Sequence, residues 1–417
     1  MSLARNFCRL LLAVVLVYSG FVKGVDPLGS MYKFIEYARA AGINGIDGLA
    51  LLAAFLLSLL EFLTGIALLF NLRTRLATRL ALLLMLFFTP FTLFTAIVRP
   101  VSDCGCFGDA LPLTPWQSFA KNLVLLALAL LAHARRKRFA SPLPAARQLA
   151  ALLLAAIAMT AVSLRGYLDL PLIDFRPYAE GKNIAAQMQP TATDGGAYSV
   201  ALYYKNKKTG EIKAFTEEDY PWQDDAWTHE RTERTRLQAI APPAIRDFSI
   251  ENAAGEDVTG DILEADEYVL LIAARRLDRV TRETQARINR LAYHARRRGY
   301  RVIGLTSATT TDINDFSKQY RPPYDLCTVD DAQLKTMIRS NPGILLLHRG
   351  VIIAKRSRQN IPEVSDLQGA DLLPYLLESQ RTRRDNLLVT SLALALLAAY
   401  LLLRPARARR RDAYRNI

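Results

Sequence analysis

The stretch LALLLMLFF, Leu80–Phe88, decides the fold class because it is apolar on every side of a helix. A helix in a soluble bundle normally keeps a polar stripe, and the stretch LVLLALALLA, Leu123–Ala132, lacks one as well. Both runs therefore predict membrane spans. A span needs about 20 mostly apolar residues, with ~17 as the lower limit. By this length criterion we expect six spans along the chain, at residues 7–25, 49–70, 76–98, 119–134, 149–164 and 387–403.

The distribution of Lys and Arg predicts how these spans are oriented. Positive side chains near span ends favour the cytoplasm, and most of them fall on one side: Arg5, Arg9, Arg73, Arg75, Arg79, residues 135–138, Arg147 and residues 404–411. Arg165 and residues 381–384 oppose this bias but are outnumbered. We expect a multi-pass protein of the cytoplasmic (inner) membrane with a retained first span and both termini in the cytoplasm. The loops 26–48, 99–118 and 165–385 then face the exported, periplasmic side.

The charge of the chain is explained by this topology. The formal net charge is +14, and much of it comes from the basic residues at the cytoplasmic ends of the spans. No stripe of interleaved aromatic and basic residues indicates RNA or DNA. Membrane lipid is therefore an expected partner, and nucleic acid is not.

Two of the four cysteines, Cys104 and Cys106, lie one residue apart in the exported loop DCGCFGD, residues 103–109. Thiols on the exported side of a membrane readily become disulfides. The pair has three interpretations: a redox-active or exchange-competent dithiol, a structural staple of the loop, or a metal site. Zinc requires four ligands, and no second Cys or His pair stands nearby, so we predict no metal.

The residues around this pair bear on its reactivity. A bridge between cysteines so close together is strained and easily reduced, and Gly105 relieves part of that strain because it adopts backbone angles closed to other residues. Asp103 and Asp109 oppose a thiolate, whereas Arg99 and Lys121 favour one.

Charges inside the spans predict a polar pocket beneath the loop. Glu61 lies well within the second span, and Lys23 and Asp26 lie at the outer end of the first. Such charges usually face a bundle interior or a water-filled cavity. With Asp103 and Asp109 they form a candidate pocket for a thiol, a quinone or a proton path; a structural intramembrane ion pair is the alternative. Transport is a third-ranked function that rests only on Glu61.

The first 134 residues resemble the DoxX superfamily of four-helix membrane proteins, and specifically its MauE-type branch. The resemblance rests on YSGFVKGVDP, residues 18–27, and on the CGCFG loop, residues 104–108, which is a recurring mark of that branch. It implies a membrane protein associated with a thioredoxin-like partner in making disulfide-rich periplasmic methylamine dehydrogenase. It does not imply methylamine as a substrate.

The exported segment predicts an α/β domain behind a linker. The stretch YSVALYYKNKKTGEIKAF, residues 198–215, reads as a hairpin that turns at residues 207–210. Farther on, the strand EYVLLIAA, the amphipathic helix TRETQARINRLAYHARRRGY and the strand RVIGLTSA form a βαβ unit. A second hairpin turns at Arg349 and Gly350. This order resembles the thioredoxin-like fold of thiol peroxidases and periplasmic reductases.

The chain departs from that fold at its redox site. The fold places Cys-x-x-Cys after the first buried strand, where this chain has AARRLDRV, Ala273–Val280. Asn341 and Pro342 match the place where the fold keeps a cis proline beside its peptide-binding groove, so we expect these two residues to bind a partner. Cys327 falls in a predicted strand and is expected to be an inert core residue.

We therefore predict a mixed architecture: an α-helical membrane bundle, an exported α/β domain and a C-terminal transmembrane helix. The expected parts are a DoxX/MauE-like domain (1–134), a fifth span (135–165), a linker with a hairpin (166–241), a thioredoxin-like domain (242–385) and a final span with a basic tail (386–417). In the favoured function Cys104 and Cys106 are catalytic and exchange electrons with an exported thiol protein or a membrane quinone. The alternative is a non-enzymatic assembly factor or receptor that uses the exported domain.

Overall fold

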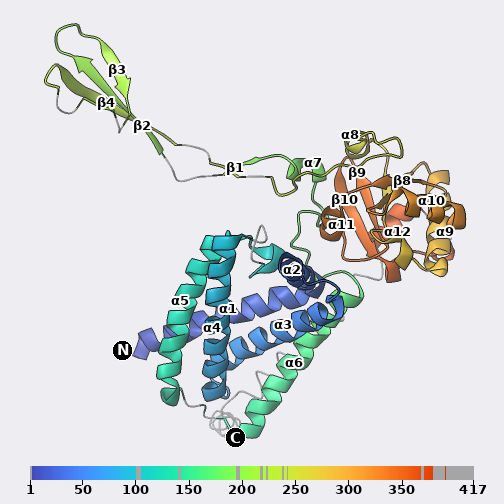
Figure 1. Cartoon of the computed structure of the whole chain (residues 1–417), viewed down its shortest axis with the longest axis horizontal. Coiled ribbons are helices and arrows are strands. Elements are labelled where there is room, and N and C mark those ends of the chain that lie inside the picture. Colours follow the sequence, from blue (N-terminus) through green and yellow to red (C-terminus); the bar gives the residue numbers. More distant parts are fainter. Residues whose placement is uncertain are drawn as a thin grey trace, which may run out of the picture.

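The computed structural model in Figure 1 describes most of the chain. The described residues are 2–99, 105–139, 141, 143–193, 198–216, 219–221, 224–236, 239–241, 243–367, 371–378 and 390. Asp103, Cys104 and the sixth predicted span, apart from Thr390, lie outside them.

Five long apolar helices form a bundle in the N-terminal part of the described chain (Figure 1). Each is long and apolar enough to cross a membrane, and large apolar side chains such as Leu83, Phe87 and Ile157 point outward from it. The prediction of a multi-pass membrane bundle is confirmed. The helices are α1 (Ser2–Val25), α3 (Asp47–Leu69), α4 (Thr74–Val98), α5 (Pro115–Ala134) and α6 (Ala145–Leu168), with the short η2 (Arg136–Arg138) after α5.

Two glycines let α1 and α3 pack with their backbones close together. A Cβ atom on Gly20 would lie 2.5 Å from the Phe62 nitrogen, and one on Gly65 would lie 2.6 Å from the Val17 nitrogen. Only glycine fits such close contacts, which are a common way for membrane helices to associate. The close approach places the next turn of α1 directly against α3.

A shorter helix, α2 (Pro27–Ala40), lies at one end of the bundle (Figure 1). It begins where Asp26 accepts a hydrogen bond from the Gly29 N–H at 2.9 Å, with Pro27 in the first turn. Its buried face packs Met31 against Ala50 of α3. The same end carries the loop that contains Cys106 and η1 (Gly108–Ala110), and we call it the Cys106 end of the bundle.

The α/β domain is built on a five-stranded sheet in the order β10-β9-β6-β7-β8. The strands β6, β7 and β8 are parallel, whereas β9 is antiparallel to β6 and β10 to β9. The predicted βαβ unit and the final hairpin are confirmed, and with them the thioredoxin-like fold class. The strands are β6 (Val269–Ala273), β7 (Arg301–Thr306), β8 (Asp325–Thr328), β9 (Gly343–His348) and β10 (Val351–Ser357).

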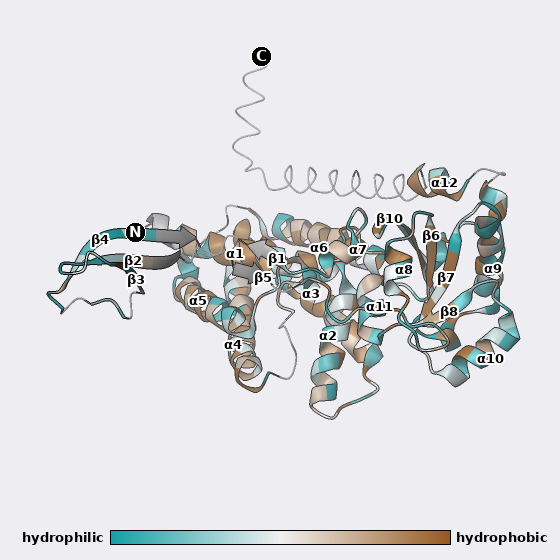
Figure 2. Cartoon of the chain, turned by 90° about the horizontal axis from the view of Figure 1, so that it is seen from above, coloured by the Kyte–Doolittle hydropathy of each residue, from teal (hydrophilic) through white to brown (hydrophobic). Residues whose placement is uncertain are grey.

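Helices cover both faces of this sheet (Figure 2). One core contains Leu271 and Leu345 with residues of α8 and α11, and the other contains Leu270 and Leu346 with residues of α9 and α12. The helices are α8 (Thr259–Leu263), α9 (Arg282–Arg297), α10 (Thr310–Tyr320), α11 (Asp331–Met337) and α12 (Leu372–Glu378), with the short η3 (Leu277–Arg279), η4 (Arg358–Asn360) and η5 (Val364–Leu367).

The segment directly after α6 belongs to this core, although we expected it in the linker. Leu170, Tyr178 and Ile184 are buried with the core of the sheet, the last of them in α7 (Ile184–Gln187). The Ile184 N–H donates to the carbonyl of Gly350 at 2.9 Å, so the segment runs beside β10. Its apolar residues are spaced too irregularly along the sequence to predict a strand or helix.

A small β arm leaves the α/β domain and ends apart from it in both views (Figures 1 and 2). A two-stranded stem carries a three-stranded sheet in the order β3-β2-β4. The predicted hairpin is confirmed as β2 and β3, whereas β4 was not predicted because its sequence alternates Thr with charges. The strands are β1 (Thr191–Thr193), β2 (Tyr198–Asn206), β3 (Ile212–Phe215), β4 (Trp227–Arg236) and β5 (Ala239–Ala241).

Candidate functional site

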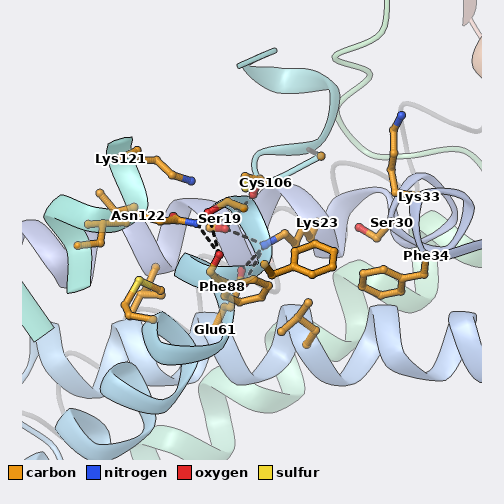
Figure 3. Close-up of a pocket in the computed structure, with 18 of the residues that line it drawn as sticks. Ser19, Lys23, Ser30, Lys33, Phe34, Glu61, Phe88, Cys106, Lys121 and Asn122 are labelled. Atoms are coloured by element: carbon orange, nitrogen blue, oxygen red, sulfur yellow. Dashed lines mark hydrogen bonds and ion pairs between the residues drawn. The ribbon is translucent and has the colours of Figure 1, made fainter. Parts of the chain in front are cut away.

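A buried ion pair joins α1 to α3 inside the bundle (Figure 3). The Lys23 Nζ atom lies 2.7 Å from each carboxylate oxygen of Glu61, and the two side chains are 9% and 3% exposed. Lys23 also donates a hydrogen bond to Ser19 Oγ at 2.9 Å. An unpaired charge inside a membrane is costly in free energy. Each of the two charges lowers that cost for the other by pairing with it. The structure thus brings together two of the residues expected in a polar pocket.

Cys106 lies over this pair and is tied to it through Ser19 (Figure 3). The Ser19 hydroxyl donates to the Cys106 carbonyl at 3.0 Å, and the Cys106 thiol is free. Lys121 of α5 lies within electrostatic reach of Cys106, and its Nζ atom is 4.1 Å from the centre of the Phe107 ring. A nearby ammonium group is one of the surroundings in which reactive cysteines are found.

Two glycines shape the loop around Cys106. Gly105 has φ +61° and Gly108 has φ +51°, in the left-handed region that favours glycine. A Cβ atom on Gly105 would also lie 3.1 Å from Cγ of Lys33, so α2 packs directly on the loop. The structure therefore holds Cys106 between α2 and the ends of α1 and α5.

The polar cluster extends to α4 and α5 through residues that the sequence analysis missed. The Asn122 side chain donates to Thr92 Oγ1 at 3.2 Å, and the Thr89 hydroxyl donates to the Asn122 carbonyl at 3.3 Å. Ser19, Thr92 and Asn122 are polar side chains in apolar spans, and such side chains tend to face the bundle interior. Other spans also carry Ser or Thr residues, such as Ser58, Thr78 and Ser163, so this signal did not single them out.

These groups line a cavity of about 60 Å³ at the Cys106 end of the bundle. Pockets that hold small organic ligands typically measure roughly 300–1,000 Å³, and this cavity is smaller. The lining combines the polar cluster with aromatic rings: Ser19, Lys23, Glu61, Thr92, Cys106, Lys121, Asn122, Phe34, Tyr37, Phe88 and Phe91.

Asp26 and Asp109 were expected in the same pocket, and the structure corrects this. Both lie outside the cavity lining and bind Arg339 of the α/β domain, with shortest distances of 2.9 Å and 3.1 Å. The reason is their position: Asp26 caps α2 and Asp109 lies in η1, so both carboxylates meet the α/β domain. Burial alone would lower the pKa of Arg339, but Asp26 and Asp109 raise it, so the guanidinium stays charged.

The edge of the sheet where the thioredoxin-like fold carries its cysteines faces this junction. The segment after β6 holds Arg275 and Arg276 there. The Asn341 side chain binds this segment twice, accepting from the Arg276 N–H at 2.8 Å and donating to the Arg276 carbonyl at 2.9 Å. The Asn341–Pro342 peptide bond is cis, as the sequence pattern predicts. Arg339, Asn341 and Pro342 therefore lie together at the membrane-facing edge of the domain.

Cys8 and Cys327 lie away from this junction. Cys327 is 5% exposed in β8, and burial raises the pKa of its thiol, which agrees with an inert core residue. Cys8 lies near the start of α1, toward the opposite end of the bundle. Within the described ranges, no group of three or more His, Cys, Asp or Glu side chains could hold a metal ion.

Replacing Arg339 with Met is expected to loosen the α/β domain from the bundle. The change removes both ion pairs and leaves two carboxylates at the junction without their cation, which costs about 2 kcal/mol or more for a largely desolvated pair. We expect faster backbone hydrogen exchange in α2 and α11 of the full chain. The matched control is Arg349→Met, because Arg349 and its partner Asp266 are 68% and 84% exposed. Equal exchange in α2 for both variants would show that Arg339 does not hold the junction.

Solved structures that resemble the chain do so over about a third of its length or less. A thiol:disulfide interchange protein from Bacteroides sp. is 16% identical, with a TM-score of 0.23 and coverage of 26% of this chain and 75% of that one. Peroxiredoxin Q from Xanthomonas campestris is 14% identical, with a TM-score of 0.24 and coverage of 32% and 90%. An uncharacterised conserved protein from Geobacillus kaustophilus is 16% identical, with a TM-score of 0.25 and coverage of 31% and 78%.

Two family models match parts of the sequence, and no curated protein matches it. Residues 198–236, which contain the three-stranded sheet of the β arm, match a domain of unknown function, DUF8463. Residues 1–135, which contain the helices α1 to α5 and the Cys106 loop, match the family of the methylamine utilisation protein MauE.

Proposed function

We propose that this protein is a membrane-anchored thiol–disulfide exchange protein whose reactive groups are Cys104 and Cys106. A redox-associated membrane role agrees with the match of residues 1–135 to MauE. The observation that carries the finer proposal is the setting of Cys106. Its free thiol lies in a glycine-hinged loop beside the Lys121 ammonium group and over a buried Lys23–Glu61 pair.

The proposed reaction exchanges one disulfide for another and needs no further cofactor. A thiolate of the pair attacks one sulfur of a disulfide in an exported protein; a mixed disulfide forms, and the other sulfur leaves as a thiol after taking a proton. The second cysteine then attacks the mixed disulfide and releases the partner as a dithiol. The pair ends as the Cys104–Cys106 disulfide, having lost two electrons and two protons to the partner. The reverse sequence oxidises the partner. A membrane quinone as the electron acceptor stays a prediction, because the exchange described here does not require one.

The α/β domain is proposed to hold the exported thiol protein while this exchange takes place. Arg339 binds Asp109, which lies three residues after Cys106, and it precedes Asn341 by two residues. We assign partner binding to Asn341 and Pro342 for this reason. The membrane domain supplies the thiols, and the edge of the α/β domain supplies the contact surface next to them.

The orientation that this function requires places the Cys106 end and the α/β domain on the periplasmic side. We expect a reporter fused after Lys208 to be active outside the cytoplasm, and reporters fused after Thr74 and Arg136 to be active inside it. The physical reason is the bias of Lys and Arg toward the opposite end of the bundle. A cytoplasmic Lys208 would place the Cys106 loop with the reducing glutathione pool and remove the basis of the proposal.

Thiol trapping in intact membranes tests the proposed function. In a Cys8→Ser/Cys327→Ser background, each remaining reduced cysteine adds the mass of one alkylating reagent. We expect Cys104 and Cys106 to change together from two tags to none as the glutathione buffer becomes more oxidising. A pair that stays bridged across that range would make the loop a structural staple, and a pair that stays reduced would contradict the exchange reaction.

A second candidate function is a non-enzymatic assembly factor that uses the exported domain as a receptor. The observation that favours it is the edge of the α/β domain, where Ala273–Val280 contains no cysteine. In this case loss of both loop cysteines leaves function intact, whereas a change at Asn341 removes it. The two candidates therefore predict opposite outcomes for the same set of variants.

A further inference from the structure

A second hollow, larger than the first, lies between the α/β domain and the Cys106 end of the bundle. Its volume is about 290 Å³, close to the lower limit for pockets that bind small ligands. We call it the interdomain crevice. Both views place α11 on the side of the α/β domain that faces α2 (Figures 1 and 2). The lining comes from α2, the end of α6, the segment after β6, α11 and the residues around Asn341. Its basic residues are Arg275, Arg276, Arg279, Lys335, Arg339 and Arg358.

The crevice carries an excess of positive charge. Asp331 pairs with Arg275 and Lys335, and their hydrogen bonds hold its pKa below the usual range although burial would raise it. Asp278 likewise forms ion pairs with both Arg276 and Arg279. The six bases of the lining thus share four carboxylates, namely Asp26, Asp109, Asp278 and Asp331.

The excess of positive charge remains when two further carboxylates, Asp169 and Asp47, are counted. Asp169 pairs with Arg165, which lies outside the lining, at 2.8 Å. Asp47 lies within electrostatic reach of Arg276 and offsets part of its charge. Within the described part of the chain, Arg358 is exposed and makes no ion pair. The cluster therefore keeps a net positive charge.

The crevice lies beside the end of a candidate membrane span. Tyr167 and Leu168 close the membrane-spanning helix α6, and both remain about two-fifths exposed. Tyrosine is enriched where a span meets the water. On the other side, the Tyr32 ring of α2 lies 5.4 Å from Lys335 Nζ and 5.4 Å from the Arg339 guanidinium carbon. The interdomain crevice therefore has cationic side chains in its interior and apolar or aromatic side chains on the side of the candidate membrane span.

We propose that the interdomain crevice binds the phosphodiester headgroup of an anionic phospholipid from the adjoining leaflet. Arginine forks bind phosphate oxygens through paired hydrogen bonds. Arg358 and Arg276 are exposed in the lining, and Arg276 would share its guanidinium between the phosphate and Asp278. A phosphodiester brings a negative charge to this positive cluster. Leu28, Tyr167 and Leu168 contact the glycerol and upper acyl groups, which a free phosphate ion does not have. The bound lipid fastens the α/β domain to the membrane surface beside the Cys106 loop.

Native mass spectrometry of the full chain in neutral detergent tests this site without reference to thiol chemistry. The probes are dioleoylphosphatidylglycerol, dioleoylphosphatidylcholine and inorganic phosphate. We expect phosphatidylglycerol to bind more tightly than the other two. The double variant Arg276→Gln/Arg358→Gln is expected to weaken that binding at least about tenfold, the effect of losing hydrogen bonds to a charged group.

The matched control is Arg290→Gln/Arg297→Gln, which removes the same charge from exposed positions of α9 and is expected to bind as the original chain does. The thermal midpoint of each variant shows whether it folds, and Arg358→Gln alone replaces the double variant if that one does not. Equal binding of the two lipids, or equal weakening by both double variants, overturns the proposal. If an equal concentration of inorganic phosphate displaces phosphatidylglycerol, the proposal that the ligand is a lipid is overturned. The crevice would then be a site for free phosphate.

Discussion

Replacing Lys23 with Met is expected to lower the free energy of unfolding of the bundle by about 3–5 kcal/mol, the usual cost of leaving one partner of a buried ion pair without the other. The Glu61 carboxylate would remain inside the bundle with its main cation removed. Glu61→Met is expected to cost a similar amount because it strands the Lys23 ammonium group. Thermal unfolding of the full chain in detergent measures both changes.

The double variant Lys23→Met/Glu61→Met distinguishes an ion pair from two separate contributions. Removal of both charges leaves nothing unpaired, so most of the lost stability is expected to return. Lys33→Met serves as the control, because Lys33 and its partner Glu36 are 24% and 45% exposed and an exposed pair contributes about 0–1 kcal/mol. If the single variants unfold within about 1 kcal/mol of the original chain, the pair does not organise the bundle.

The second large effect is expected at the loop cysteines. Cys104→Ser and Cys106→Ser should each remove catalysed disulfide exchange with a fluorescent glutathione disulfide, so that the reaction returns to the uncatalysed time scale of minutes to hours. Each change removes one of the two sulfurs that the proposed reaction needs. Stopped-flow fluorescence of the purified full chain measures the rate.

These substitutions are expected to leave the bundle folded. A bridge that closes so short a loop removes little entropy from the unfolded chain, so its loss has little effect on stability. Cys8→Ser and Cys327→Ser are the matched controls and should exchange at the original rate. Full complementation of function in cells by the Cys104→Ser/Cys106→Ser double variant would reduce the pair to an incidental staple and support the assembly factor.

The spans were predictable because each is a continuous apolar run, and length with composition decides such a case. The observed helices extend the predicted runs by a few residues, since capping and polar end residues carry no hydropathy signal. At the start of α5, for example, Thr114 caps the helix and exchanges hydrogen bonds with Gln117. The βαβ unit was predictable for a similar reason: two buried strands flank one helix whose apolar residues recur with helical spacing.

The junction between the two parts of the molecule was not predictable. Arg339 and Asp26 are separated by 313 residues in the sequence, and a local pattern carries no signal of such a contact. The helix α2 was hidden as well, because PLGSMYKFIEYARA mixes apolar and polar residues without a strong stripe. The sequence therefore indicated which charged residues are chemically notable. Only the tertiary contacts show which of them line the cavity and which bind the α/β domain. Lys23 and Glu61 line the inner cavity, whereas Asp26 and Asp109 hold the α/β domain.

A redox titration of the full chain against glutathione buffers tests the central claim most directly. Peptide mapping by mass spectrometry follows whether Cys104 and Cys106 are joined or reduced at each buffer potential. We expect one two-electron transition in which the pair loses two hydrogens together. Its potential should lie above about −300 mV, because structural disulfides typically have lower potentials and resist reduction. A pair that remains fully bridged throughout, or cysteines that titrate independently of each other, would contradict this claim.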